Sequence, residues 1–249
     1  MACRFRSEGR QARSDKETLM NLHGYLPSLL EGSLLTLAVA LSSMALAMLL
    51  GLLGALAKLS RWRAAKAVAT VYTTLIRGVP DLLLMLLIFF GGQVLVNNVA
   101  MALGHEDYID INPFVAGVLT IGFIFGAYLT EAFRGAFLAV PPGQREAGLA
   151  YGMSPRQVAW RITFPQMFRH ALPGLSNNWL VLIKSTAIVS VIGLHDLMTR
   201  GMQAAGSTRE PFVFYSAVAL IYLVFTTLSE LLFSHLNQRL SIGVRRQSL

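Results

Sequence analysis

The sequence predicts an all-α integral membrane protein with five transmembrane helices, and three observations lead to that prediction. The chain has 249 residues, of which 54% are hydrophobic and 14% charged, whereas soluble domains average about 25% charged residues. The apolar residues are gathered into runs of about 20 or more, the length that crosses a bilayer core. The formal net charge is +8, and after residue 19 most of the basic residues fall in the loops between these runs and in the tail. This is the positive-inside pattern of membrane proteins rather than the basic patch of a nucleic-acid-binding protein.

The apolar runs also place the individual spans. Residues 20–249 are expected to form one transmembrane domain, with a loop at 141–165 between the third and fourth spans. The second span is interrupted at the sequence Gly78-Val79-Pro80. The five spans are expected at about 29–57, 64–96, 113–140, 171–194 and 212–236.

Lysine and arginine in the loops predict the orientation of the spans. The second loop, around Asp107 and Asp110, contains neither Lys nor Arg, whereas the first and third loops and the tail are basic. Loops rich in Lys and Arg stay in the cytoplasm. We therefore expect a periplasmic N-terminus and a cytoplasmic C-terminus. The basic residues of the first loop, third loop and tail are Lys58, Arg61, Arg63, Lys66, Arg145, Arg156, Arg161, Arg169, Arg239, Arg245 and Arg246.

Residues 1–19 conflict with this orientation because they place five basic residues on the outer side. They contain no apolar core of their own, so they are not a signal peptide. We interpret them as a non-native or disordered extension and Met20 as the natural start, with Met1 as the alternative.

The loop at 141–165 has the pattern of two short helices joined by a sharp turn. Glu146 is expected in the first turn of the first helix, where a carboxylate favours the positive helix end. Gly152 suits a helix C-cap, because glycine tolerates the left-handed conformation found there. Ser154 and Gln157 have the spacing of a capping box that starts the second helix, and Pro165 is expected to stop it. Such a rigid surface element is suited to docking a soluble partner.

This loop resembles the cytoplasmic coupling loop of ABC importer permeases, whose pattern is Glu-Ala-Ala, three residues, Gly, nine residues, Ile-x-Leu-Pro. Gly148 stands where the family has its second Ala, Phe164 stands where it has Leu, and the spacing is intact. The resemblance covers nearly the whole chain from Met20. It extends to the polar amino acid permeases, and within them to the Q-type permease subunits of histidine/lysine–arginine–ornithine importers. The stretches involved are 72–81, 131–135, 177–179, 182–186 and 210–212.

The resemblance implies a type I ABC importer permease fold and a set of partners. These are an ATP-binding subunit dimer, a second homologous permease subunit, a periplasmic substrate-binding protein and the lipid bilayer of the bacterial inner membrane. The two permease subunits are expected to form a heterodimer, with a homodimer as the alternative. ATP is then bound by the partner subunits, and no cofactor is expected on this chain. The residues expected to couple it to the ATPase are Glu146, Ala147, Gly148, Gly152, Ile162 and Pro165.

Six ionisable residues interrupt the spans. A charged side chain at a helix centre costs about 2.5–3.5 kcal/mol on insertion scales, so each should face a partner or a wet cavity. Four of them are candidates for the substrate path: Asp81 as a counter-charge for a cationic side chain, together with Glu131, Arg77 and Lys184. The alternative for these four is internal pairing: Asp81 with Arg77 or Lys184, Glu131 with Arg134, and Lys184 with Asp81 or Glu131. The six are Arg77, Asp81, Glu131, Arg134, Lys184 and Glu230.

The sequence thus indicates a permease subunit that imports basic amino acids by alternating access and is not itself an enzyme. It has no Walker-type loop for ATP hydrolysis, and Cys3 is its only cysteine, so no disulfide or cysteine-based metal site is expected. One alternative is an ion-gradient-driven secondary amino acid transporter, which explains buried carboxylates but not the coupling spacing. Another is a permease for a different polar amino acid, such as glutamine or an opine. A membrane-embedded enzyme is disfavoured because no catalytic motif is present. The sequence does not separate histidine, arginine, lysine and ornithine as substrates.

Overall fold

The computed structural model describes residues 22–105 and 107–240, so the predictions for residues 1–19 and Met20 lie outside the described residues. The described part of the chain is helical and contains no strand. Five helical segments are long and apolar enough to cross a membrane, as the sequence predicted. They are α2 (Leu26–Leu59), α4 (Asp81–Ala102), α5 (Pro113–Leu138), the continuous run Pro155–Ile192 and α10 (Pro211–Leu240).

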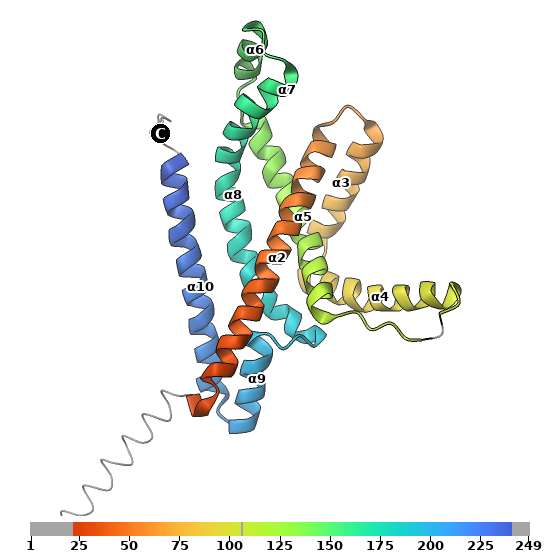
Figure 1. The fold of residues 1–249 in the computed structure, drawn as a ribbon, viewed down its shortest axis with the longest axis vertical. Coiled ribbons are helices and arrows are strands. Elements are labelled where there is room, and N and C mark those ends of the chain that lie inside the picture. Colours follow the sequence, from red (N-terminus) through yellow and green to blue (C-terminus); the bar gives the residue numbers. More distant parts are fainter. Residues whose placement is uncertain (1–21, 106, 241–249) are drawn as a thin grey trace, which may run out of the picture.

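The expected second span, 64–96, is interrupted at the predicted position, Gly78-Val79-Pro80. It is divided into α3 (Arg63–Gly78) and α4, and the two run in clearly different directions in Figure 1. Val79 is extended, with φ −113° and ψ 141°, because a residue before proline is disfavoured in the helical region. With 16 residues, α3 rises only about 24 Å, less than the roughly 30 Å hydrocarbon core.

The α4 helix also ends later than predicted, at Ala102. Two buried amide side chains tie its last turns to the loop that follows. Asn97 donates to the carbonyl of Ile109 at 3.0 Å and accepts from its N–H at 2.8 Å. Gln93 accepts from the N–H of Ile111 at 3.0 Å. The loop before α5 is therefore held against the helix by satisfied polar groups.

Helix α5 lies at the centre of the molecule, packed against α2 on one side and α8 (Phe164–Ser185) on the other. Small residues allow the close approach of α2 and α5. A Cβ on Gly51 would lie 2.6 Å from Leu129 Cβ, and a Cβ on Gly122 would lie 2.6 Å from Leu46 Cδ2. Close backbone contact through small residues is the usual way that helices associate in membranes.

The fourth span is irregular at its C-terminal end. Helix α8 stops at Ser185 and continues as a 3₁₀ helix, η3 (Thr186–Ile192), which ends at Gly193 with φ +88°. Asp196 then caps α9 (Leu197–Thr208) by accepting from the N–H of Thr199 at 2.9 Å. Helix α9 is too short to cross the membrane and packs against α2 and α10.

The described chain has two distinct ends (Figure 1). Helix α9 and the start of α2 lie at one end. At the other lie α6 (Pro142–Ala150), α7 (Pro155–Val158), the α2–α3 turn and the last turn of α10.

Candidate functional site

The first candidate site is the projection formed by α6 and α7 at one end of the molecule (Figure 1). Helix α6 begins directly at Pro142, whose fixed φ suits the first helical position. Glu146 therefore lies in the second turn, and the prediction of a first-turn carboxylate was wrong. At the other end, Gly152 has φ +79°, and its N–H donates to the Leu149 carbonyl at 3.0 Å. The N–H of Met153 donates to the Gly148 carbonyl at 3.1 Å, which completes a Schellman C-cap.

Helix α7 begins with the predicted capping box. The Ser154 hydroxyl accepts from the N–H of Gln157 at 3.3 Å, and the Gln157 side chain accepts from the N–H of Ser154 at 2.8 Å. Pro165 does not stop this helix, contrary to the prediction. A π-helical turn, Ala159–Thr163, joins α7 to α8, and Phe164 donates to the carbonyl of Ala159. This wider turn carries the helix past the proline, whose ring removes a donor and crowds the preceding turn.

Gly148 and Ile162 form the contact that locks the two arms of the projection together. A Cβ on Gly148 would lie 2.8 Å from Ile162 Cδ1 and 3.0 Å from Val158 Cγ2. The glycine that departs from the family pattern is therefore the residue that leaves room for Ile162. The projection is continuous with α8 through the π turn, and its two arms contact each other closely.

The outer surface of the projection is exposed and only partly polar. Glu146 and Ala147 are exposed, while Gly148 is buried. Three large apolar side chains are exposed beside them: Leu149 at 48%, Tyr151 at 89% and Trp160 at 65%. Exposed apolar groups rimmed by polar residues are typical of a protein–protein contact.

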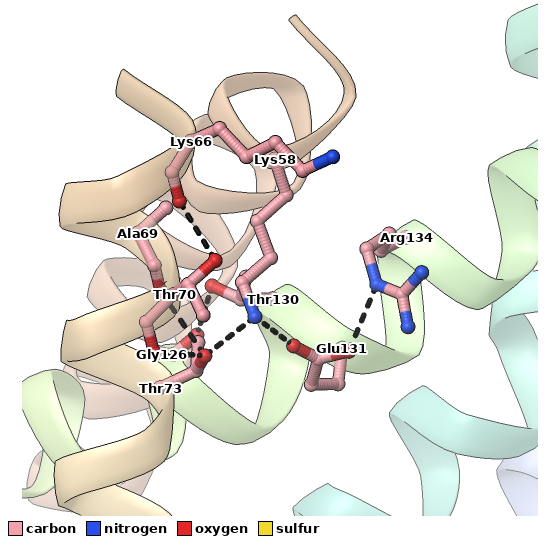
Figure 2. A network of polar contacts seen from close by, with 9 residues as sticks. All are labelled: Lys58, Lys66, Ala69, Thr70, Thr73, Gly126, Thr130, Glu131 and Arg134. Atoms are coloured by element: carbon pink, nitrogen blue, oxygen red, sulfur yellow. Dashed lines mark hydrogen bonds and ion pairs between the residues drawn. The ribbon is translucent and has the colours of Figure 1, made fainter. Parts of the chain in front are cut away.

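The second candidate site is a charged cluster between α2, α3 and α5 (Figure 2). One carboxylate oxygen of Glu131, on α5, forms an ion pair with Lys58 of α2. The other oxygen forms an ion pair with Arg134 at 2.9 Å. Lys58 also donates to the Thr73 hydroxyl of α3 at 2.6 Å. The predicted pairing of Glu131 with Arg134 is thus present, and Lys58 adds a second cation.

Sequence reasoning placed Lys58 in a loop and missed its part in this cluster. Its side chain is only 11% exposed. The signal was the helical spacing of Gly51, Gly54 and Lys58, which lie on one face of α2. The two glycines contact α5, so the same face carries the lysine to Glu131.

Asp81 lies where α3 and α4 separate. As the first residue of α4, its carboxylate faces the positive helix end. The Tyr128 hydroxyl of α5 donates to Asp81 Oδ1 at 3.1 Å, and the Arg77 guanidinium lies 5.8 Å from the centre of the same ring. Among the described residues, no ion pair joins Asp81 to Arg77 or Lys184. Neither of the two ion pairs considered for Asp81 is therefore present in this structure.

Lys184 is in the last turn of α8, immediately before the 3₁₀ segment η3, and it is exposed. It makes no ion pair within the described part of the chain, neither with Asp81 nor with Glu131. Asn177, two helical turns earlier, is exposed on the same face. A seven-residue 3₁₀ helix is longer than the usual three to four residues. Irregular backbone at membrane depth is tolerated where it is buried in protein or lines a wet cavity.

Five spanning helices and a two-helix projection between the third and fourth of them define a class of protein, the permease subunits of type I ABC importers. The chain belongs to the family of binding-protein-dependent transport system inner membrane components, which matches residues 47–242. It is therefore a multi-pass protein of the inner membrane.

Particular relatives narrow this class. The chain is 52% identical to the histidine/lysine/arginine/ornithine transport system permease protein HisQ of Escherichia coli K12, over 92% of this chain and 100% of that protein. It is 41% identical to the octopine transport system permease protein OccQ of Rhizobium radiobacter, over 90% of this chain and 94% of that one. A solved amino acid ABC transporter with histidines shares 33% identity and a TM-score of 0.74, covering 89% of this chain and 98% of that chain. These relatives place the chain among amino acid permeases of ABC importers and argue against the alternative of an ion-gradient-driven secondary transporter.

Proposed function

We propose that this chain is a permease subunit of an ATP-driven importer that carries histidine, arginine, lysine and ornithine into the cytoplasm. The observation that supports this best is the 52% identity with HisQ along that protein's whole length. The spacing of the coupling pattern is intact in the same chain. The chain supplies the path and the coupling and performs no covalent chemistry.

In this proposal the α6–α7 projection is the docking element for an ATP-binding subunit dimer, which binds and hydrolyses the nucleotide. Closure of the dimer on ATP pushes the projection, and the continuous helix from Pro155 to Ile192 carries the motion into the spans. The projection, the α2–α3 turn and the end of α10 lie at the cytoplasmic end, because basic residues gather there. The N-terminus is then periplasmic, where a substrate-binding protein delivers the amino acid.

A second, homologous permease subunit completes the path, in a heterodimer. Lys184 and Glu230 support this, because both are exposed on spanning helices, and a charge facing lipid is costly. Asn177, Glu230 and Ser234 line an open cavity of about 360 Å³ between α8 and α10. We infer that this face turns toward the second subunit and the path between the two.

The candidate path residues have different roles in this account. Glu131 already holds two cations, so it fixes α2, α3 and α5 rather than receiving a substrate. Asp81, held by the neutral Tyr128 hydroxyl, keeps its charge available for a cationic side chain, and Arg77 lies beside it on the same ring. Lys184, next to η3, is placed to receive the α-carboxylate that all amino acids share.

Co-purification tests the assembly that this function requires. The tagged chain, expressed with the rest of its cellular proteins, should carry an ATP-binding subunit and a second permease through detergent extraction. Identification of both by mass spectrometry is the expected result. A chain that purifies without any ATP-binding subunit, yet transports amino acids in vesicles, would overturn the proposal.

An opine is the second candidate substrate, because OccQ is 41% identical to this chain. Octopine carries a cationic guanidinium group as arginine does, so Asp81 suits either. Uptake competition separates them, and we expect excess lysine to block arginine uptake more strongly than excess octopine.

A further inference from the structure

An apolar groove runs between α2 and α3 and is not used by the proposed transport path. One wall is the α2 face formed by Leu53, Gly54 and Ala57, and the other is the α3 face formed by Ala65 and Val68. The groove has a volume of about 460 Å³. Its lining is apolar apart from one tyrosine, so water gains no hydrogen bonds along most of it.

The bottom of the groove is formed by two aromatic rings. The rings of Tyr72 and Phe123 lie there with their centres 4.9 Å apart. The Tyr72 hydroxyl donates to the backbone carbonyl of Phe123, so its polar end is already satisfied. The groove therefore presents hydrocarbon to its occupant.

The groove leads to a strongly basic turn. Its lining residues are spaced at helical intervals on two consecutive helices, so both walls converge on the turn that joins them. Arg61, Arg63 and Lys66 are exposed at this turn, and residues 58–80 contain no Asp or Glu. Trp62, 79% exposed, lies among them, as expected of a tryptophan at the membrane–water interface.

Two further features leave positive charge available at the turn. Lys58 is engaged with Glu131 and Thr73, whereas the Lys66 side chain makes no contact with that cluster (Figure 2). Helix α3 begins without a side-chain cap and without an acidic residue in its first turn. The positive end of its dipole and its free N–H groups thus add to the three cations.

We propose that the groove and turn bind an anionic phospholipid of the bilayer leaflet at that end. One acyl chain lies along Ala57, Ala65 and Val68, and the phosphate meets Arg61, Arg63 and Lys66. Basic pockets between spanning helices are known to recognise such headgroups. Charge complementarity selects this occupant, because an apolar helix from another subunit would leave three cations facing it without counter-charges. The inference depends on the chain being a membrane protein and not on which amino acid it transports.

Lipid retention in the purified full-length chain, with whatever subunits accompany it, tests the proposal. Native mass spectrometry measures binding of phosphatidylglycerol and, as a neutral probe, phosphatidylcholine with the same acyl chains. We expect phosphatidylglycerol to bind at least about tenfold more tightly, given the strength of attraction per cation near a membrane. The triple change Arg61→Gln, Arg63→Gln and Lys66→Gln should abolish most of that preference.

Matched variants separate the groove from general charge and from misfolding. Ala65→Phe fills the groove and should weaken binding of phosphatidylglycerol by about fivefold or more, while Ala67→Phe, exposed on α3 outside the groove, should not. Arg239→Gln removes a cation at the same end of the molecule and should leave lipid preference unchanged. Equal retention of the two lipids by the wild type, or an unchanged preference in the triple variant, would overturn the proposal. So would disulfide cross-linking of Val68→Cys to another protein subunit, because a protein would then occupy the groove.

Discussion

The Lys58–Glu131 pair gives the sharpest prediction about how the spans hold together. Lys58→Met removes the cation but keeps the length of the side chain. The two side chains are 11% and 19% exposed, so the pair is largely removed from water. Loss of one partner from a buried pair costs about 3–5 kcal/mol. Arg134 still contacts the other carboxylate oxygen of Glu131, so we expect the lower end, about 3 kcal/mol.

Two control variants are compared with the expected loss of about 3 kcal/mol in Lys58→Met. Arg134→Gln breaks the more exposed contact, in which the arginine is 39% exposed, and should cost about 1 kcal/mol or less. Lys66→Met removes an exposed lysine outside the cluster and should change stability little. The double variant Lys58→Met with Glu131→Gln should recover part of the loss, because the carboxylate is no longer left with a single partner.

The assay is unfolding of the detergent-solubilised chain by SDS, followed by circular dichroism. A double-mutant cycle on Lys58 and Glu131 isolates their coupling from the other contacts of each residue. If Lys58→Met costs no more than Lys66→Met, or if the two single losses simply add in the double variant, the reasoning about a buried ionic tie is refuted.

Three other predictions follow from the structure. Asp81→Asn should reduce vesicle uptake of arginine about tenfold more than uptake of neutral histidine at pH 8, a difference of about 1.4 kcal/mol; equal losses would remove Asp81 from the substrate path. Gly148→Leu should separate the arms of the projection, since even a Cβ there meets Ile162 at 2.8 Å. It should therefore abolish attachment of the ATPase, measured by co-purification. The control Ala147→Leu changes an exposed residue and should have less effect. Burial raises the pKa of Asp196 above 3.8, so the native state binds the extra proton, and the free energy of unfolding should fall as pH rises from about 4 through the raised pKa. Asp196→Asn, which keeps the cap, should lose that slope in unfolding measured between pH 4 and 7; an unchanged slope would contradict the assignment.

Two local predictions in the projection are confirmed, whereas the placement of Glu146 in the first turn of α6 was wrong because the helix begins already at Pro142. The positive φ at Gly152 and the Ser154–Gln157 capping box depend on neighbours within a few residues, and both are present as predicted. The number of spans likewise follows from apolar length alone.

The errors arose where distant segments or two competing rules decide the outcome. Pro165 was predicted to stop the helix because proline lacks a backbone N–H. The π turn before it lets the helix continue past the proline, and no pattern in the sequence predicts that turn. The break at Val79 was visible, yet hydropathy does not say how far α4 turns away from α3. Lys58 was assigned to a loop because its partner, Glu131, is 73 residues away in the chain.

The candidate path residues could also be predicted only in part. The cost of a charge in a membrane indicates that Asp81, Glu131 and Lys184 each need a partner or a wet cavity. Which of them is neutralised within the chain depended on packing of α2, α3 and α5, so only the structure separated the paired Glu131 from Asp81.

The central claim is that motion of the α6–α7 projection couples ATP hydrolysis to amino acid entry. Proteoliposomes containing the assembled importer, its binding protein and labelled arginine test it most directly, with wild type compared to Gly152→Val. The valine is disfavoured at φ +79° but meets open space, so the chain should still insert. We predict ATP-dependent uptake in the wild type and, in the variant, loss of uptake with loss of arginine-stimulated ATP hydrolysis. Uptake and stimulated hydrolysis at wild-type rates in the variant would contradict the account.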